Sequence, residues 1–359
     1  MKKIVFILSS LNDVHYQKRV KEFIDKGYHV EVYGFKRKNQ SKPSGIGYNF
    51  IILGEIENRN FLSRLGVFRK AIKSISKDCN GKICFYGSLD IAIFATIYIK
   101  SRYLYEVCDL TELVFNNSII RNILILINKS IIKKSINTIV TSEGFIDFFN
   151  TIDKEKFCLI PNKVDPRCPL PIPKQILSQT NRLKIGFVGV IRFETVYNFI
   201  KVCSEINNGY ELHLFGIYSE GDIYAEKIKK IVANTSSIYF HGRFKNPEDL
   251  PSIYSQIDLL LCTYPPTLGV RYAEPNKLYE AIYFRCPIIV NAQTFLAEKV
   301  KKIDVGYVVD ALDEKDIYKF IQTLSCLDYQ RKVESCEKIP RSSCLNINDE
   351  YFDKIESLC

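Results

Sequence analysis

The sequence lacks the paired cysteine spacings that hold metal ions or build disulfide frameworks. Its twelve cysteines are scattered from Cys79 to Cys359, and none of them forms a Cys-x-x-Cys pair. Zinc sites and disulfide-rich domains use such spacings, so we expect neither here. Free thiols in that number fit the reducing cytoplasm, which is where we expect this protein.

Long apolar runs are also missing. The opening run, 4–8, stops at two serines without a small-residue cleavage site, which favours a buried first strand over a signal peptide. The apolar segment 116–135 is interrupted too often by polar residues to span a bilayer. Two alternatives remain for this segment. It is either a helix buried against a parallel sheet, which we favour, or an interfacial helix near a lipid-linked acceptor.

Motifs for several binding classes are absent as well. No helix-turn-helix, zinc finger or aromatic ribonucleoprotein motif is present, and the basic residues are dispersed, so we expect no nucleic-acid partner. No Gly-x-Gly-x-x-Gly follows an early strand, which disfavours a nicotinamide oxidoreductase. The formal net charge of +10 over 359 residues favours anionic partners, namely nucleotide diphosphates, lipid phosphates or a bilayer surface.

What the sequence does contain is a regular alternation of short β-rich runs and amphipathic stretches, which predicts parallel sheets covered by helices. In the first half, strands are expected at 3–8, 28–34, 82–86, 103–107, 138–141 and 156–160, and helices at 14–26, 60–77, 88–100, 117–135 and 143–150. In the second half, strands are expected at 184–189, 210–215, 237–240, 257–262, 287–290 and 306–309, and helices near 196–206, 222–233, 247–255, 275–284, 294–301 and 313–325.

The alternation pauses where five prolines fall within 161–173, because prolines forbid a regular helix or a central strand. We therefore predict a Rossmann-like acceptor-side domain over 1–165, a linker over 166–183 and a Rossmann-like donor domain over 184–345. A last helix within 346–359 is predicted to pack back on the first domain. The expected fold class is α/β, with two doubly wound domains facing across a cleft, because open parallel sheets bind ligands outside the carboxyl ends of their strands.

The most informative segment is Pro-Asn-Lys-Leu-Tyr-Glu-Ala at 275–281. Pro275 suits the first turn of a helix, where backbone amides point at an anion such as a diphosphate. Lys277 adds positive charge in the same turn, although it opposes the helix dipole. Glu280 lies one turn further on and can accept two hydrogen bonds from a ribose. A surface Lys–Glu pair is the equally weighted alternative.

This segment, followed by Cys-Pro-Ile-Ile-Val at 286–290, resembles the donor-site signature of glycosyltransferase family 4, whose members have the GT-B fold of two facing Rossmann domains. The resemblance implies that Glu280 binds the donor ribose and that the helix start binds the diphosphate. A second glutamate of that family, which contacts the transferred sugar, falls at Tyr272 here. Glu274 is its candidate substitute. The donor-binding residues predicted from this helix are Glu274, Pro275, Asn276, Leu278 and Glu280.

The segment 184–192 resembles the first strand of the family's donor domain. Gly189 would let the backbone approach a phosphate closely, and Arg192 would neutralise it. The family's base-binding region matches 240–242, where we expect His241 to be structural or to line the base pocket.

The first half resembles the family in an Asp-x-x-x-x-Lys-Arg pattern at 13–19, where Asp13 is expected to cap the first helix. Lys18 and Arg19 face either an anionic acceptor or water, and we favour water.

A second match in this half is Tyr-Glu-Val-Cys-Asp-Leu at 105–110, with Cys108 in place of the family's histidine. Asp109 follows a strand end on the functional rim and is the best acidic candidate of the first half, with an N-cap role equally open. Glu106 is expected to be less informative.

For transfer, the main barrier is departure of the nucleotide diphosphate. Arg192, Lys277 and the amides near residue 275 can stabilise the growing negative charge, and Asp109 completes the predicted catalytic set. No Asp-x-Asp motif on a turn is present, so we expect no metal and no cofactor beyond the nucleotide-sugar donor. The resemblance implies retention of anomeric configuration.

We therefore expect a glycosyltransferase that moves a sugar from a nucleotide-diphosphate sugar to a glycan or lipid-linked acceptor in surface polysaccharide synthesis. It would be cytoplasmic, with peripheral contact at the inner face of the membrane. Two alternatives stay open: a nucleotide-sugar epimerase of the same fold, and a catalytically weak nucleotide-sugar-binding subunit. Cys108 and Tyr272 keep the second of these open.

Overall fold

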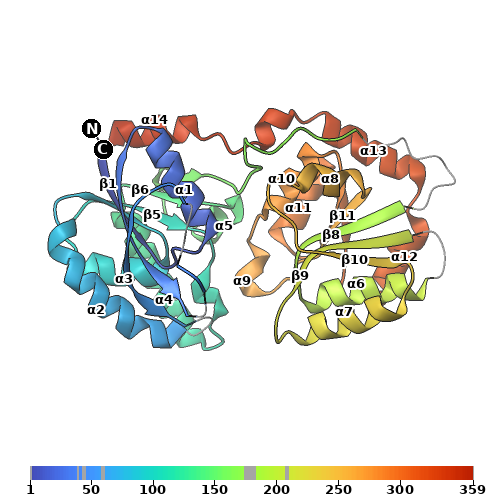
Figure 1. Ribbon diagram of the computed structural model, residues 1–359, viewed down its shortest axis with the longest axis horizontal. Coiled ribbons are helices and arrows are strands. Elements are labelled where there is room, and N and C mark those ends of the chain that lie inside the picture. Colours follow the sequence, from blue (N-terminus) through green and yellow to red (C-terminus); the bar gives the residue numbers. More distant parts are fainter. Residues whose placement is uncertain are drawn as a thin grey trace. The chain divides into compact units, whose positions relative to one another are not determined.

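The computed structural model describes residues 2–38, 40–42, 46–57, 61–173, 183–206 and 210–358. The chain divides into two compact units (Figure 1). The first unit comprises 1–160 and 348–359, and the second comprises 161–347.

The first unit is built on a seven-stranded, all-parallel sheet in the order β3-β2-β1-β4-β5-β6-β7. Its strands are β1 (Lys3–Leu8), β2 (His29–Arg37), β3 (Phe50–Ile56), β4 (Ile83–Tyr86), β5 (Tyr103–Val107), β6 (Asn137–Val140) and β7 (Phe157–Leu159). The sequence analysis missed β3. The strand order changes direction between β1 and β4, so this pair is the topological switch point of the sheet.

Helices of the first unit connect these strands. They are α1 (Val14–Asp25), α2 (Phe61–Cys79), α3 (Leu89–Tyr98), α4 (Ser118–Lys134), α5 (Glu143–Phe148) and α14 (Asp349–Leu358), with the 3-10 turns η1 (Thr111–Val114) and η2 (Lys154–Lys156). Asp13 caps α1 as expected, since its carboxylate accepts a hydrogen bond from the amide of His15. The C-terminal α14 joins the core of this unit, where the ring of Phe352 packs 4.9 Å from that of Phe23.

The second unit repeats this architecture with a six-stranded parallel sheet in the order β10-β9-β8-β11-β12-β13. Its strands are β8 (Leu183–Ile191), β9 (Tyr210–Tyr218), β10 (Ile238–Gly242), β11 (Leu259–Cys262), β12 (Ile288–Asn291) and β13 (Gly306–Val309). Here the switch point lies between β8 and β11. The α/β class with two doubly wound units is confirmed.

Helices of the second unit are more numerous than the sequence pattern predicted. They are α6 (Glu194–Glu205), α7 (Ile223–Asn234), α8 (Leu250–Ser255), α9 (Leu268–Arg271), α10 (Asn276–Tyr283), α11 (Phe295–Ile303), α12 (Glu314–Thr323) and α13 (Cys326–Glu337), with the 3-10 turn η3 (Arg341–Cys344). The sequence analysis missed α9 and α13. It expected residue 275 inside the helix start, whereas Pro275 is the N-cap of α10 and the helix begins at Asn276.

The unit boundary falls at residues 160 and 161, earlier than the position after residue 165 that the prolines suggested. Backbone pairing explains the difference. The amide of Val164 donates to the carbonyl of Cys344, and the amide of Asn346 donates to the carbonyl of Val164. These bonds tie the start of the expected linker to the second unit. Half of the expected linker, 174–182, lies outside the described residues.

Candidate functional site

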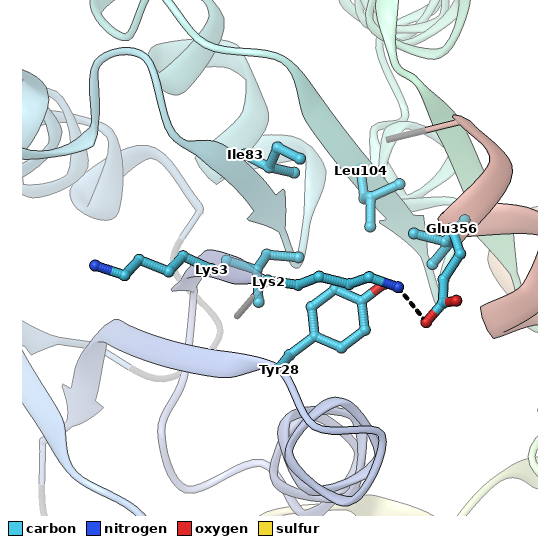
Figure 2. A pocket seen from close by; sticks show the side chains of 8 residues that line it. Lys2, Lys3, Tyr28, Ile83, Leu104 and Glu356 are labelled. Atoms are coloured by element: carbon cyan, nitrogen blue, oxygen red, sulfur yellow. Dashed lines mark ion pairs between the residues drawn. The ribbon is translucent and has the colours of Figure 1, made fainter.

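One pocket of the first unit lies at the wrong edge of its sheet for a substrate. Figure 2 shows it beside the helix that carries Glu356, lined by residues at or near the starts of strands, such as Lys3, Ile83 and Leu104. The ammonium of Lys2 pairs with the carboxylate of Glu356, 2.5 Å away. Ligands of parallel sheets bind at the carboxyl ends of the strands, so we assign no substrate to this pocket.

A second pocket lies at the switch point of the second unit. Its lining includes Gly189 on β8, Arg192 directly after β8, Thr263 after β11 and Lys277 on α10. Its cavity volume is about 120 Å³. Three residues of the sequence-predicted set (Gly189, Arg192 and Lys277), drawn from segments almost ninety positions apart, therefore line one cavity.

Close approach of two backbones shapes the rim of this pocket. Gly189 on β8 pairs with Gly216 on β9, and both have positive φ angles, 149° and 140°. A Cβ atom on Gly216 would lie 1.7 Å from the carbonyl oxygen of Gly189. Only glycine fits there, so this β8–β9 edge presents bare backbone next to the pocket.

Arg192 directly follows β8 and is exposed to solvent. Its guanidinium lies 4.5 Å from the ring centroid of Phe193, whose φ of 77° turns the chain into α6. Stacking on a ring limits the motion of the guanidinium while leaving its N–H groups available. The residue is therefore positioned to meet an anion in the pocket.

The start of α10 provides a second anion-binding feature. Among the residues that the structure describes, the amides of Asn276 and Lys277 have no hydrogen-bond acceptor. The amide of Leu278 donates to the carbonyl of Pro275. First-turn amides without partners, at the positive end of a helix dipole, attract anions. The side chain of Leu278 is wholly buried in the core, and its predicted donor contact stays a prediction.

Glu280 and Lys277 form a buried pair, not the surface pair that was the alternative interpretation. The ammonium of Lys277 lies 2.6 Å from a Glu280 oxygen, and both side chains are at most a tenth exposed. The hydroxyl of Tyr254 donates to the same oxygen at 2.6 Å, and Asn276 donates to the other oxygen at 2.5 Å. Burial, followed by the charge of Glu280, raises the pKa of Tyr254, which keeps it a donor. Burying an ion pair is costly, so this one calls for a functional reason.

Glu274 has a different environment from the one predicted. Its carboxylate is buried, pairs with the ammonium of Lys299 through both oxygens at 2.8 Å, and accepts a hydrogen bond from the hydroxyl of Tyr279. The residue thus links the loop before α10 to α11, and its carboxylate is committed to these partners. Tyr272, two residues earlier, is the half-buried C-cap of α9.

Thr263 is a pocket residue that the sequence analysis missed. Its hydroxyl oxygen is buried and has no hydrogen-bond partner in the described chain, while its carbonyl accepts from the hydroxyl of Thr195 at 2.5 Å. Buried polar groups are normally paired, so an unpaired hydroxyl at the lining of a pocket suits a ligand atom. The only sequence feature that could have indicated Thr263 is its position directly after β11, a strand that Asp258 precedes.

His241 lies on an aromatic surface at the end of β10. Its ring stacks on Phe215 at 4.2 Å and shares a hydrogen bond of 3.0 Å with His213. Burial lowers the pKa of His241, so the ring is neutral and stacks as an aromatic group. The structural or base-lining role of His241 stays a prediction.

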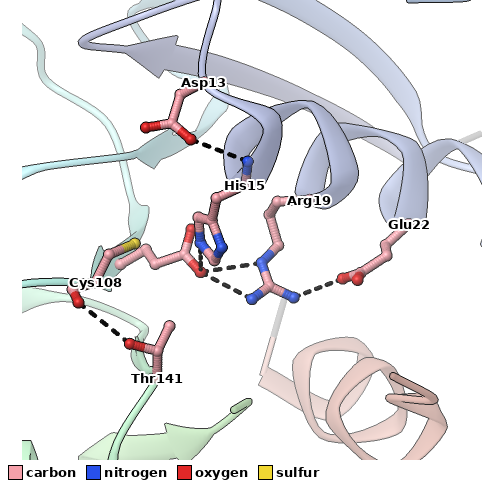
Figure 3. A network of polar contacts seen from close by, with 7 residues as sticks. Asp13, His15, Arg19, Glu22, Cys108 and Thr141 are labelled. Atoms are coloured by element: carbon pink, nitrogen blue, oxygen red, sulfur yellow. Dashed lines mark hydrogen bonds and ion pairs between the residues drawn. The ribbon is translucent and has the colours of Figure 1, made fainter. Parts of the chain in front are cut away.

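In the first unit the carboxyl edge of the sheet carries a polar network (Figure 3). Glu106 on β5 is fully buried, and one of its oxygens accepts hydrogen bonds from Arg19 at 2.8 and 3.1 Å. The same oxygen lies 3.0 Å from His15 Nε2. Arg19 also pairs with Glu22. Arg19 is only 3% exposed, so the expectation that it faces water is wrong, and Glu106 is the organising residue of this edge.

The charges of this network shift the pKa values of its members. Burial opposes ionisation of Glu106, but the charges of Arg19 and then His15 outweigh it and lower the pKa of this carboxyl to about 2. Burial also opposes the charged form of His15, and the attraction of Glu106 outweighs it, so the pKa of His15 is raised. The result is an ionised carboxylate that holds an imidazole, with the His15 side chain 22% exposed.

Cys108 and Asp109 follow Glu106 at the strand end. The ligand atoms of His15, Glu106 and Cys108 lie within 4.8 Å of one another, close enough to hold a metal ion. However, Arg19 and His15 already share one oxygen of Glu106, and burial, followed by the charges of Glu106 and Asp109, raises the pKa of the Cys108 thiol well above its usual range. A protonated thiol is a poor ligand, so the geometry favours an ion-pair network over a cation site.

Asp109 itself is exposed at the rim of this edge. It does not cap the following turn, because the N-cap of η1 is Leu110. The N-cap alternative is therefore wrong, and the catalytic role stays a prediction.

Comparisons with known proteins agree with this architecture. Residues 182–326, within which the pocket of the second unit lies, match the family described as "Glycosyl transferases group 1". The chain is thus a glycosyltransferase with the GT-B fold. The succinoglycan biosynthesis protein ExoL of Rhizobium meliloti (strain 1021) is 23% identical over 385 residues, covering 99% of this chain and 91% of that protein.

Solved structures give the same fold. Sucrose-phosphate synthase from Thermosynechococcus elongatus superposes with a TM-score of 0.72 at 15% identity, covering 100% of this chain and 98% of that one. Anabaena HepE, solved in complex with UDP and glucose, has a TM-score of 0.70 at 15% identity, covering 99% of this chain and 100% of that one. No helix among the described residues is long and apolar enough to cross a membrane.

Proposed function

We propose that this glycosyltransferase transfers a sugar from a nucleotide-diphosphate sugar bound in the switch-point pocket of the second unit to a glycan or lipid-linked acceptor. The observation that carries the proposal is the convergence of Arg192 and Lys277 on one cavity, where Lys277 stands in the first turn of α10 with its unpaired amides. Two cations and a helix start together neutralise a diphosphate. HepE, which shares the fold, was solved with UDP and glucose, and this supports a nucleotide-sugar donor.

Residue roles follow from this assignment. The backbone at Gly189 and the hydroxyl of Thr263 approach the phosphates, while Arg192 and Lys277 meet the charge that grows on the leaving diphosphate. Glu280 exchanges the donors that now surround it for ribose hydroxyls, as the resemblance to family 4 implies. Glu274 supports the loop before α10. Among the first-unit residues, Asp109 is the predicted acidic catalytic group.

The reaction is proposed to need no metal and to retain the anomeric configuration. Cationic side chains and helix amides can stabilise a leaving diphosphate without an ion, which supports metal independence. Retention rests on the resemblance to family 4. Both are tested with purified protein: transfer is expected to continue in excess chelator, and the anomeric proton of the first product is expected to show the configuration of the donor.

The biological setting is proposed to be surface polysaccharide synthesis on the cytoplasmic side of the membrane. The likeness to a succinoglycan biosynthesis protein over almost the whole chain supports this setting.

The experiment that tests the function is a thermal-shift screen of nucleotide sugars, followed by transfer assays with the donor that stabilises the protein most. A ligand that binds only the native state raises the apparent stability, so the true donor must raise Tm. Transfer to a glycan or lipid-linked acceptor is expected. Stabilisation without transfer or hydrolysis would indicate a binding subunit, and epimerised nucleotide sugar would indicate an epimerase. Either outcome contradicts the proposal.

A further inference from the structure

The N-terminal half of α4 is exposed, although the sequence analysis favoured a buried helix. Ile119, Ile123 and Leu126 are 69%, 51% and 67% exposed. Their spacing of four and three residues places them on one stripe of the helix. Ile120, next to this stripe, and Val114 on η1 are also exposed. We call these five side chains the apolar face. Single exposed apolar residues are common, but a contiguous group on one helix marks an interaction surface.

This face is held rigidly by the interior of the first unit. The C-terminal half of α4 buries Ile131 and Ile132 in the fold. On its inner side Asn128 donates a buried hydrogen bond of 3.1 Å to Glu112, which lies on η1. Asn117 caps the helix by accepting from two amides of the first turn. The exposed stripe thus belongs to an ordered, capped helix joined to η1.

Charge on α4 has one sign. The helix carries Arg121, Lys129, Lys133 and Lys134, and it contains no Asp or Glu. None of these four cations forms an ion pair with another described residue. Lys133 and Lys134 are exposed at the C-terminal end of the helix. An apolar stripe beside unpaired cations is the pattern of a helix that lies at the surface of an anionic bilayer.

A second copy of the chain is a poorer occupant of this surface. In a two-fold contact each partner presents the same patch, so eight cations from two α4 helices would gather at one interface without an acidic residue from either helix. Like charges that face one another oppose such a dimer. Anionic lipid headgroups, in contrast, neutralise the lysines while the acyl region accepts the isoleucines.

We propose that α4 and η1 dock the first unit on an anionic lipid bilayer through the apolar face, with the lysines of α4 on the lipid phosphates. This deepens the membrane setting of the proposed function, since a lipid-linked acceptor would lie in the same bilayer. The argument rests on α4 and η1 alone and not on the donor pocket, so the two proposals can fail separately.

The test measures binding of the whole protein to sedimented vesicles of phosphatidylcholine, with and without about 30% phosphatidylglycerol, because anionic headgroups attract lysines near the surface. Leu126→Glu is compared with Leu327→Glu, a matched control because Leu327 is 71% exposed on α13. The parent and the control are expected to bind anionic vesicles equally, and Leu126→Glu to bind at least tenfold more weakly. A second variant, Lys133→Gln/Lys134→Gln, is expected to lose about thirty-fold on anionic vesicles.

Thermal unfolding of each variant and its turnover of free nucleotide sugar are measured alongside, and both are expected to match the parent. Equal vesicle binding by the parent and Leu126→Glu would overturn the proposal. So would a dimer, seen by sedimentation velocity, that Leu126→Glu dissociates while vesicle binding is absent. If the parent itself shows no turnover, that result would count against the proposed function but not against the docking surface.

Discussion

Glu280 in the second unit and Glu106 in the first are both buried beside a cation at the functional edge of their sheets, yet the two carboxylates are satisfied differently. Both oxygens of Glu280 accept hydrogen bonds, from Asn276 on one side and from Lys277 and Tyr254 on the other. In Glu106 a single oxygen accepts all the bonds from Arg19 and His15, and the other oxygen is buried without a partner among the residues that the structure describes. Glu280 has donors on both oxygens, whereas Glu106 has donors on one oxygen only and both of these donors are cationic or can be.

This difference predicts different consequences of mutation. Removing one donor from Glu280 leaves others in place, so the second unit should remain folded and lose function. Removing Arg19 leaves Glu106 as a buried charge with one partially exposed imidazole, so the first unit should lose stability. The contrast separates a network built for a ligand from one built for the fold.

The largest expected effect is therefore on stability, in Arg19→Met. Breaking a buried ion pair by removing one partner costs about 3–5 kcal/mol. We expect the free energy of unfolding, measured by urea titration, to fall by that amount. The double variant Arg19→Met/Glu106→Leu removes both charges and should recover most of the loss. If the double variant is as unstable as the single one, packing by the Arg19 stem is responsible, and the charge account is wrong.

The same contrast explains which site residues could be predicted from the sequence. One helical turn brings together Asn276, Lys277 and Glu280, because they lie within five residues. Their motif could therefore be recognised in the sequence. Arg19 and His15 reach Glu106 across 87 and 91 residues. Only the pairing of β1, β4 and β5 places them together, and strand order could not be predicted from the sequence alternation.

The misses in the fold have similar causes. Strand β3 follows a stretch rich in lysine, glycine and serine, and its alternation is weak because Ile51 and Ile52 are both exposed. Leu278 matched a motif, yet its burial depends on which face of α10 meets the core. The ion pair of Glu274 depends on Lys299, 25 residues away on α11.

The second prediction concerns chemistry in the second unit. Lys277→Ala removes a cation that meets charge growing on the leaving diphosphate, so kcat should fall by about a hundred- to a thousand-fold, the scale of one lost electrostatic donor. KM should change much less, because ground-state binding retains Arg192 and the helix amides. Steady-state kinetics with the stabilising donor measure both. A rise in KM at unchanged kcat would show that Lys277 acts in binding alone.

A smaller effect is expected from Glu280→Gln, which keeps the shape and some hydrogen bonding of the side chain. Donor affinity measured by calorimetry should weaken by about 1–3 kcal/mol, the scale of a charge-assisted hydrogen bond. Glu274→Gln is the matched comparison on the same segment. It breaks the pair with Lys299, so it should lower Tm while donor affinity stays near that of the parent. If Glu274→Gln loses donor affinity and Glu280→Gln does not, the result would support the sugar contact that the sequence suggested for Glu274.

The smallest effect is the pH dependence contributed by His15. Its pKa is raised in the folded protein, so its pairing with Glu106 contributes stability fully below the unfolded pKa of about 6.5 and loses it as pH rises through the folded pKa. Glu106 stays ionised over this range. His15→Gln should therefore cost about 1 kcal/mol of unfolding free energy at pH 5.5 and less at pH 8.5. An equal cost at both pH values would show that the imidazole is not charged in the fold.

The central claim is that the switch-point pocket of the second unit binds the diphosphate of the donor. Its most direct test is calorimetric binding of the nucleoside diphosphate whose sugar derivative stabilises the protein, to the parent and to Arg192→Gln/Lys277→Gln. The matched control is Lys229→Gln/Lys230→Gln, which removes two exposed charges of α7. Losing two charge-assisted contacts should weaken the double variant by about a hundred-fold or more, with the control unchanged. Equal affinity in the parent and both variants would contradict the account.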